Sequence, residues 1–282
     1  MTRNDLKFSG NSILTKLVRN SFKAIEEGSY ELPPGVDHTN HTTISLKKQI
    51  LNCKHVPLVT EIKFSSPSKG TLVKRNGSHN IETIVSEMER GHSSGISILT
   101  QPFLFDGSIS HILKARRNTH LPILMKDVIV SDVQISSAKK IGADCVLLIK
   151  TIFDKNMTEG SLEKFSEQAK KLGLEVIVET HQVDEFEESV TMNKKGSNKM
   201  FDIIGINNRN LDTLAIDLDN TKKILSSCIK GNNLVLAESG IYSKEHILSL
   251  REAGADAFLV GTSLMENVNN IGNKISELYL SY

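Results

Sequence analysis

The sequence predicts a (β/α)8 TIM barrel, an α/β fold, preceded by an N-terminal helical extension. Between residues 56 and 261, eight short apolar runs alternate with amphipathic stretches of helical spacing. Eight such units within about 250 residues match this barrel in number and in length. A doubly wound open sheet shares the alternation but usually has fewer strands, and its glycine-rich GxGxxG turn is absent from the sequence.

Residues 1–50 precede the first predicted strand. The segment 11–28, NSILTKLVRNSFKAIEEG, has the apolar spacing of a helix, and a Pro-Pro pair interrupts the pattern shortly after it. A second short helix is expected within residues 44–53, ISLKKQILNC. We therefore expect an N-terminal helical extension that packs against the barrel, and a single barrel domain over residues 1–282.

The predicted strands are continuously apolar, as expected for parallel strands that are buried on both faces. The helical stretches between them include residues 81–91, 161–173 and 243–255, which end at or near a glycine suited to a left-handed cap. Ser161 and Ser243 stand at the N-cap positions of two of these helices. The eight strands are expected within residues 56–62, 95–100, 121–126, 144–149, 174–179, 201–206, 233–238 and 256–261.

The composition argues against several classes of protein. The formal net charge of +1 gives no general attraction to nucleic acid or to an anionic membrane. No apolar run approaches the roughly 20 residues that a membrane helix needs. The three cysteines are far apart without CxxC spacing, so neither a disulfide framework nor a zinc site is indicated. The first ten residues lack the apolar segment of a secretory signal, so we expect a cytoplasmic location.

Charged and polar side chains follow the predicted strands at the points where they end. Active sites of (β/α)8 barrels lie at the carboxyl ends of the strands, so these side chains are expected to meet. Solvation of a strand end explains any single one of them, but buried charges are unfavourable unless they are paired or used, and the whole set therefore favours an active site. Facing carboxylates and ammonium groups also shift one another's pKa values into a useful range. The set comprises Glu61, Lys63, Lys126, Asp127, Glu179, Asn207, Asn208, Arg209, Glu238 and Ser239.

Glycines directly follow the last two predicted strands, in AESGI (237–241) and LVGTSLM (259–265). Backbone N–H groups of these two loops often bind a phosphate in barrels, so Gly240, Gly261 and Thr262 are predicted phosphate ligands, with Ser239 nearby. Glycine after a strand is also common in turns that bind no ligand. Two such loops at the last two units together favour the phosphate interpretation.

Several segments together resemble the indole-3-glycerol phosphate synthase family. EIKFSSPSKG carries the string E-x-K-x-x-S-P-S, and IGINNRNLDTL carries G-I-N-x-R-x-L; PILMKDVIV, VIVETHQVDEF, LAESGI and AFLVGTSLM also resemble that family, in the same order. The resemblance covers about residues 11–280. It implies ring closure, decarboxylation and dehydration of 1-(2-carboxyphenylamino)-1-deoxyribulose 5-phosphate to indole-3-glycerol phosphate in tryptophan biosynthesis. It further implies that no metal or organic cofactor takes part.

The resemblance also implies roles for individual residues. Lys126 is similar to the general acid that protonates the substrate ketone, and Glu61 to the partner that holds this lysine charged. Lys63 resembles the lysine that contacts the anthranilate carboxylate, and Glu179 resembles the carboxylate that assists the loss of water. Which lysine acts at which step stays open. Asn207 and Ser239 are counted with these catalytic residues, and substrate contacts are implied for Ser66, Phe105, Arg209, Leu211 and Glu238. Phe105 and Leu211 could equally be packing residues.

A few positions depart from the family pattern. Phe64 stands where relatives commonly carry a basic residue, and Gln101 where they commonly carry an acid. Lys150 follows a strand that usually exits with apolar residues, and we expect a surface lysine there or else an extra positive group near the mouth. The polar segment 71–82 is expected to be mobile and could close over the substrate.

Alternative functions remain open from the sequence alone. A Schiff-base aldolase would use Lys126 or Lys150 as nucleophile. Phosphoribosylanthranilate isomerase has the same fold but lacks the E-x-K and S-P-S string, and a barrel that merely binds phosphosugars would need no catalysis. The expected partner is a small phosphorylated molecule rather than nucleic acid or membrane, and the expected state is a monomer or weak homo-oligomer.

Overall fold

Eight parallel strands close into a barrel in the computed structural model, which describes residues 12–36, 39, 41–73, 80–194 and 199–279. Each strand pairs with its neighbours along the chain, and the last strand pairs back with the first, with Leu58 opposite Phe258. The predicted (β/α)8 barrel is therefore confirmed, and every predicted strand range overlaps an observed strand. The strands are β1 (Leu58–Ile62), β4 (Gly95–Leu99), β5 (Ile123–Lys126), β6 (Cys145–Ile149), β7 (Glu175–Thr180), β8 (Ile203–Asn207), β9 (Leu234–Glu238) and β10 (Ala257–Val260).

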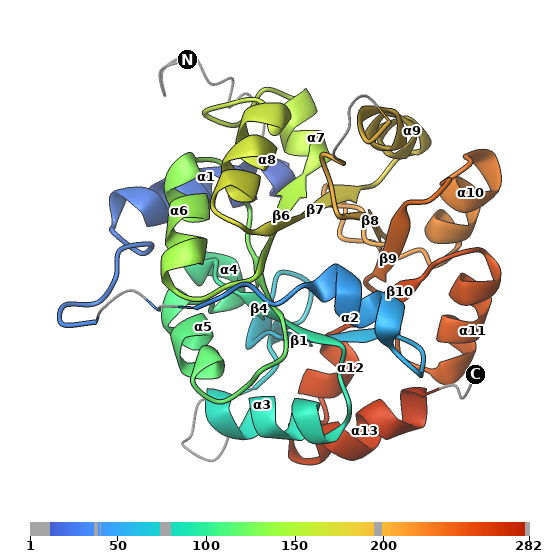
Figure 1. The fold of residues 1–282 in the computed structure, drawn as a ribbon, viewed down its shortest axis with the longest axis horizontal. Helices are drawn as coiled ribbons and strands as arrows, with labels where there is room; N and C mark the ends of the chain where they lie inside the picture. The colour runs from blue at the N-terminus through green and yellow to red at the C-terminus, as the bar shows by residue number, and fades with distance from the viewer. Residues whose placement is uncertain (1–11, 37–38, 40, 74–79, 195–198, 280–282) are drawn as a thin grey trace.

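Helices surround the barrel and cover the outer face of the sheet (Figure 1). Their apolar sides are buried against the strands, which themselves are almost entirely buried, as the continuous apolar runs predict. The larger helices are α3 (Ile81–Arg90), α5 (Ile109–Arg116), α6 (Asp132–Lys140), α8 (Leu162–Lys171), α9 (Val183–Met192), α10 (Asp219–Ser227), α11 (Lys244–Glu252) and α13 (Ile271–Leu278). Short helical turns also occur at α4 (Pro102–Phe105), α7 (Lys150–Asp154), α12 (Thr262–Met265) and η2 (Val268–Asn270).

The predicted helix ends are mostly confirmed. The hydroxyls of Ser161 and Ser243 accept hydrogen bonds from backbone N–H groups of the first turns of α8 and α11. Gly173 and Gly254 have the positive φ of a left-handed cap, at 75° and 110°. For Gly91 the prediction of a left-handed cap is wrong, because its φ is −75°. A side chain there would instead collide with Ile275 of α13, so this glycine permits close helix packing.

The N-terminal extension reaches both ends of the barrel. Helix α1 (Ile13–Glu26) begins at the N-cap Ser12, and α2 (Leu46–Asn52) begins at the N-cap Ser45, within the two predicted segments. Leu46 packs against Gly95, the first residue of β4, so α2 covers the amino-terminal end of the barrel. In Figure 1, α2 accordingly lies in front of the centre of the barrel, whereas α1 passes behind α6 at the upper left.

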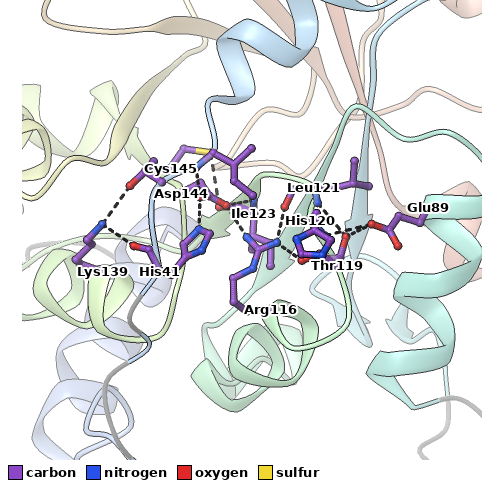
Figure 2. A network of polar contacts seen from close by, with 12 residues as sticks. His41, Glu89, Arg116, Thr119, His120, Leu121, Ile123, Lys139, Asp144 and Cys145 are labelled. Carbon is purple, nitrogen blue, oxygen red and sulfur yellow. Dashed lines mark hydrogen bonds and ion pairs between the residues drawn. The ribbon is translucent and has the colours of Figure 1, made fainter.

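Polar contacts hold the extension to the amino-terminal end of the barrel (Figure 2). Asp144 directly precedes β6 and is fully buried. Its carboxylate accepts hydrogen bonds from the His41 ring at 2.7 Å, the Ile44 N–H at 2.6 Å, Arg116 at 2.8 Å and the Ile123 N–H at 2.7 Å. One carboxylate thus joins the extension, the end of α5 and the start of β5.

A small antiparallel hairpin, β2 (Ser65–Ser66) and β3 (Gly70–Thr71), follows β1 at the opposite end of the barrel. Most of the segment 71–82 predicted to be mobile follows this hairpin, and its residues 74–79 lie outside the described part of the chain. Within the described residues, no helix combines the length and the apolar character that crossing a membrane would require.

Candidate active site

A cavity of about 850 Å³, part of it open to solvent, lies at the carboxyl ends of the strands. All the predicted site residues line the cavity except Ser66, Asn208 and Glu238. Those that line it are Glu61, Lys63, Phe105, Lys126, Asp127, Glu179, Asn207, Arg209, Leu211, Ser239, Gly240, Gly261 and Thr262.

Lys126 ends β5 and is surrounded by carboxylates. Its Nζ lies 2.5 Å from Oε2 of Glu238 and 3.6 Å from Oε2 of Glu179. Oε2 of Glu61 is 4.0 Å away. Burial by itself would lower the pKa of Lys126, but the three carboxylates outweigh it and raise the pKa above its usual value. Lys126 is therefore held as an ammonium ion at the cavity wall.

The closest cation to Glu61 is Lys63 rather than Lys126. Nζ of Lys63 donates a hydrogen bond of 2.8 Å to Oε1 of Glu61, and Glu61 is only 4% exposed. Burial alone would raise the pKa of Glu61, but the charges of Lys63, Lys126 and Arg209 together lower it. The two opposite charges at the exit of β1 are thus a buried ion pair that also lines the cavity.

Two further carboxylates have different surroundings. Oε1 of Glu179 accepts a hydrogen bond of 3.0 Å from the amide of Asn207, which fixes its orientation beside Lys126. Glu238 is fully buried behind the cavity wall, and among the described atoms its Oε1 has no hydrogen-bond partner. Burial raises the pKa of Glu238 above its usual value, against the charge of Lys126. Glu238 therefore faces Lys126 and not the cavity.

The loops after β9 and β10 form one side of the same cavity. Ser239 has a φ of 69°, which is uncommon for a residue other than glycine, and Gly240 follows with a φ of 80°. A side chain at Gly240 would also collide with Ile216. This tight turn brings the backbone of both residues to the cavity, beside Gly261 and Thr262.

Gly261 is required by a close approach rather than by backbone strain, because its φ is −128°. A Cβ atom there would lie 2.6 Å from Oε1 of Glu61. We expect Gly261→Ala to displace Glu61 with its partner Lys63 and to lower kcat/KM by roughly 100-fold. Gly231→Ala is the control: a Cβ atom there would meet nothing within 4 Å, and Gly231 lies outside the cavity, so its φ of 57° strains only the local backbone. Steady-state kinetics check both, and equal losses in the two variants would contradict the steric account.

The remaining predicted contact residues fall into two groups. Phe105 at the end of α4 and Leu211 supply apolar walls, and Arg209 donates hydrogen bonds of 3.1 Å to the Ser68 hydroxyl and to the Leu214 carbonyl. Arg209 thereby ties the β2–β3 hairpin to the loop after β8. Ser66 is buried in that hairpin, where its hydroxyl accepts a hydrogen bond from the Lys69 N–H.

The positions that depart from the family pattern have structural explanations. Phe64 is buried and packs edge-on against the ring of His111. Gln101 is fully buried and caps α4 by accepting a hydrogen bond from the Leu104 N–H. Lys150 is only 3% exposed, and its ammonium group binds Asp154 and Glu188.

The expectation of a surface lysine at position 150 is therefore wrong, and Lys150 does not line the cavity either. Helix α7 begins directly after β6, so the side chain of its first residue turns toward α9 instead of the barrel mouth.

Several lining residues had no sequence signal. Leu17 comes from α1 of the extension, and Tyr242 follows the predicted phosphate loop. Asp127 was recognised only as part of the exit of β5, beside Lys126. In the described parts of the chain, no group of His, Cys, Asp or Glu side chains is arranged to hold a metal ion. The expectation of catalysis without a cofactor stays a prediction.

Solved structures with the same architecture include the tryptophan synthase complex from Pyrococcus furiosus. The match has a TM-score of 0.54 at 13% sequence identity and covers 80% of this chain and 98% of that chain. A second structure of the same complex gives a TM-score of 0.52 at 15% identity with the same coverage. At such low identity, the likeness concerns the fold alone.

Sequence comparisons identify the family. The family model described as indole-3-glycerol phosphate synthase matches residues 14–278. The protein of that name from Methanocaldococcus jannaschii is 40% identical over 247 residues, which is 87% of this chain and 86% of the relative. The one from Staphylococcus haemolyticus is 34% identical over 273 residues, 95% of this chain and 98% of the relative. With this cavity and these matches over most of its length, the chain belongs to the indole-3-glycerol phosphate synthase family.

Proposed function

We propose that this protein converts the anthranilate-linked ribulose phosphate to indole-3-glycerol phosphate, with release of one CO2 and one water. The observation that carries the proposal is the single cavity that two lysines, Lys63 and Lys126, share with Glu179 and with the glycine loops at Gly240 and Gly261. Membership of the family supports the same reaction.

Ring closure calls for an acid. When the aromatic carbon attacks the ketone, negative charge develops on the ketone oxygen, and a fixed ammonium group beside it stabilises the transition state. Lys126 suits this role because Glu238, Glu179 and Glu61 keep it protonated. The alkoxide takes a proton from Lys126 and becomes the hydroxyl that is later lost. Loss of CO2 then leaves its electron pair in the new ring.

Dehydration calls for an acid and a base. Protonation lets the hydroxyl leave as water while a carboxylate removes a proton from the adjacent carbon of the five-membered ring, and the double bond that forms completes the indole. Glu179, oriented by Asn207, suits the base, and Lys63 suits both the acid and the contact to the anthranilate carboxylate. We assign the phosphate to the backbone of Gly240, Gly261 and Thr262, and the aromatic ring to the wall at Phe105 and Leu211. Arg209 keeps its predicted role in substrate contact, and Ser239 its predicted place among the catalytic residues. Ser66 does not line the cavity, so no substrate contact is assigned to it, and Glu238 acts through Lys126.

A Schiff-base aldolase is the less suitable function for this cavity. Such an enzyme needs a neutral amine as nucleophile. The pKa of Lys126 is raised by three carboxylates, so its neutral form is disfavoured. Lys150, the other candidate, binds two carboxylates outside the cavity.

One assay tests the proposed function. We expect the purified chain, treated with EDTA, to convert the anthranilate-linked ribulose phosphate into a product with indole fluorescence and to release an equal amount of CO2. Retained activity in EDTA also tests the prediction that no metal takes part. Binding without product would favour a phosphosugar-binding barrel, and a borohydride-trapped adduct with a ketose phosphate would favour an aldolase.

The predicted cytoplasmic location, the absence of nucleic-acid and membrane partners, and a monomeric or weakly associated state remain part of the proposal. Sedimentation of the purified chain over a range of concentrations measures the last of these.

A further inference from the structure

One buried carboxyl group at the cavity has no part in the reaction above. Asp127 directly follows Lys126, lines the cavity and is 3% exposed. The carboxylate accepts hydrogen bonds from three donors: the Val128 N–H at 2.7 Å, the hydroxyl of Thr100, and the hydroxyl of Tyr30 at 2.8 Å. A buried carboxylate with this number of donors is held in one orientation.

Tyr30 comes from the N-terminal extension and is almost completely buried. Its backbone carbonyl accepts a hydrogen bond of 2.8 Å from the hydroxyl of Ser137 in α6, which fixes the segment that carries it. Burial raises the pKa of Tyr30 well above its usual value, so its hydroxyl remains a donor over the accessible pH range. The extension thus supplies a fixed donor to a residue next to Lys126.

Thr100 connects this contact to the backbone of Lys126. While its hydroxyl donates to Asp127, its N–H donates a hydrogen bond of 3.2 Å to the carbonyl of Lys126. The turn after β5 is therefore clamped on both sides of the bond between Lys126 and Asp127. A shift of this turn would move the Lys126 ammonium group relative to its carboxylates.

We infer that Tyr30 and Asp127 are positioning residues for the reaction: the Tyr30 hydroxyl orients the Asp127 carboxylate, and Asp127 fixes the turn that carries Lys126 into the cavity. The inference rests on the proposed function, in which Lys126 is the acid. Together with Leu17 of α1, which lines the same cavity, Tyr30 would make the extension a working part of the active site.

The carboxylate form of Asp127 is the one that accepts from Tyr30 and Thr100 together. Burial raises the pKa of Asp127 to about 6, while the hydrogen bonds from Thr100, Tyr30 and the Val128 N–H act in the opposite direction. Tyr30 is the titratable group that faces it from the extension, and Lys126 adjoins it along β5. As the pH falls through about 6, Asp127 becomes protonated, and kcat should fall with it. The fall of kcat at low pH is the acid limb of the pH profile. Loss of the Tyr30 donor removes a hydrogen bond to the charged form of Asp127, so the acid limb should move to higher pH.

The test is Tyr30→Phe, with kcat and KM measured across the pH range and unfolding in urea measured in parallel. We expect kcat at neutral pH to fall roughly 10-fold with KM almost unchanged. The midpoint of the acid limb should shift upward by about half a pH unit or more, which is the effect of one hydrogen bond to the charged form. In Asp127→Asn, the additional change Tyr30→Phe should cause no further shift of the acid limb.

Tyr279→Phe is the control, because it also removes a tyrosine hydroxyl, in this case a half-buried one that donates to the Gly91 carbonyl away from the cavity. It should leave kcat and the acid limb at their wild-type values. An unchanged pH profile in Tyr30→Phe, or the same shift in Tyr279→Phe, overturns the inference. The proposed function stands in that case as long as the unmodified chain turns over the substrate. Absence of turnover in the wild type overturns both.

Discussion

Replacing Lys126 by methionine is expected to lower kcat by about 1,000-fold or more while the chain remains folded. General acids contribute roughly 10²–10⁴ to a rate, and a fixed ammonium group near a developing alkoxide adds electrostatic stabilisation. Because this interaction strengthens only in the transition state, KM should change little. Because the pKa of Lys126 is raised, the wild type keeps its ammonium group at alkaline pH, so the loss should persist there instead of shrinking.

Lys150→Met provides a closely matched control for this prediction. Lys126 ends a barrel strand and Lys150 directly follows one. Their side chains are 14% and 4% exposed, and both bind carboxylates. Only Lys126 lines the cavity. We therefore expect Lys150→Met to lower the free energy of unfolding but to retain kcat. Turnover of Lys126→Met within a few-fold of the wild type would contradict the role of Lys126 as the acid.

The convergence of the site residues could be predicted from the sequence because it follows from topology. In a closed parallel barrel all strands exit at one end, so Lys126 and Glu179, far apart in sequence, must approach each other once the strands are located. The particular pairs could not be predicted. Lys126 binds Glu238 most closely, and Glu61 binds Lys63, because side-chain rotamers and burial decide between carboxylates of equal charge.

Residues of the extension were beyond prediction for a different reason. The apolar spacing of residues 11–28 predicts a helix but does not say where on the barrel that helix docks. Leu17 and Tyr30 reach the active site through tertiary contacts that leave no local pattern. Lys150 was misplaced because a sequence pattern does not show whether a helix begins immediately after the strand.

Buried or partly buried aspartates at the amino-terminal end of the barrel lead to a prediction about stability. Three aspartates each stand at or just before the start of a strand and accept a hydrogen bond from the first part of the preceding strand: Asp144 from the Ile123 N–H, Asp202 from the Val176 N–H, and Asp256 from the Val235 N–H. Each also binds one cation, Arg116, Lys170 and Lys230 respectively. Each carboxylate thus joins two neighbouring strands and a basic side chain.

The three pairs differ in burial, and Asp144 also accepts hydrogen bonds from the His41 ring and the Ile44 N–H, so both differences should set their contributions. The aspartate side chains are 0%, 13% and 29% exposed for Asp144, Asp202 and Asp256. Asp144→Ala leaves Arg116, itself only 7% exposed, without its partner and should lower the free energy of unfolding by about 3–5 kcal/mol. Asp256→Ala removes a solvent-screened pair and should cost about 1 kcal/mol, with Asp202→Ala between them.

Urea unfolding measures this order, since the midpoint shifts with stability while an unchanged m value indicates the same cooperative transition. All three variants should keep kcat while folded, because the aspartates lie at the end of the barrel opposite the cavity. Equal losses of stability for Asp144→Ala and Asp256→Ala would contradict the dependence on burial. They would mean instead that the backbone hydrogen bond, which the three residues share, supplies most of the stabilisation, and that the cation at each site adds little.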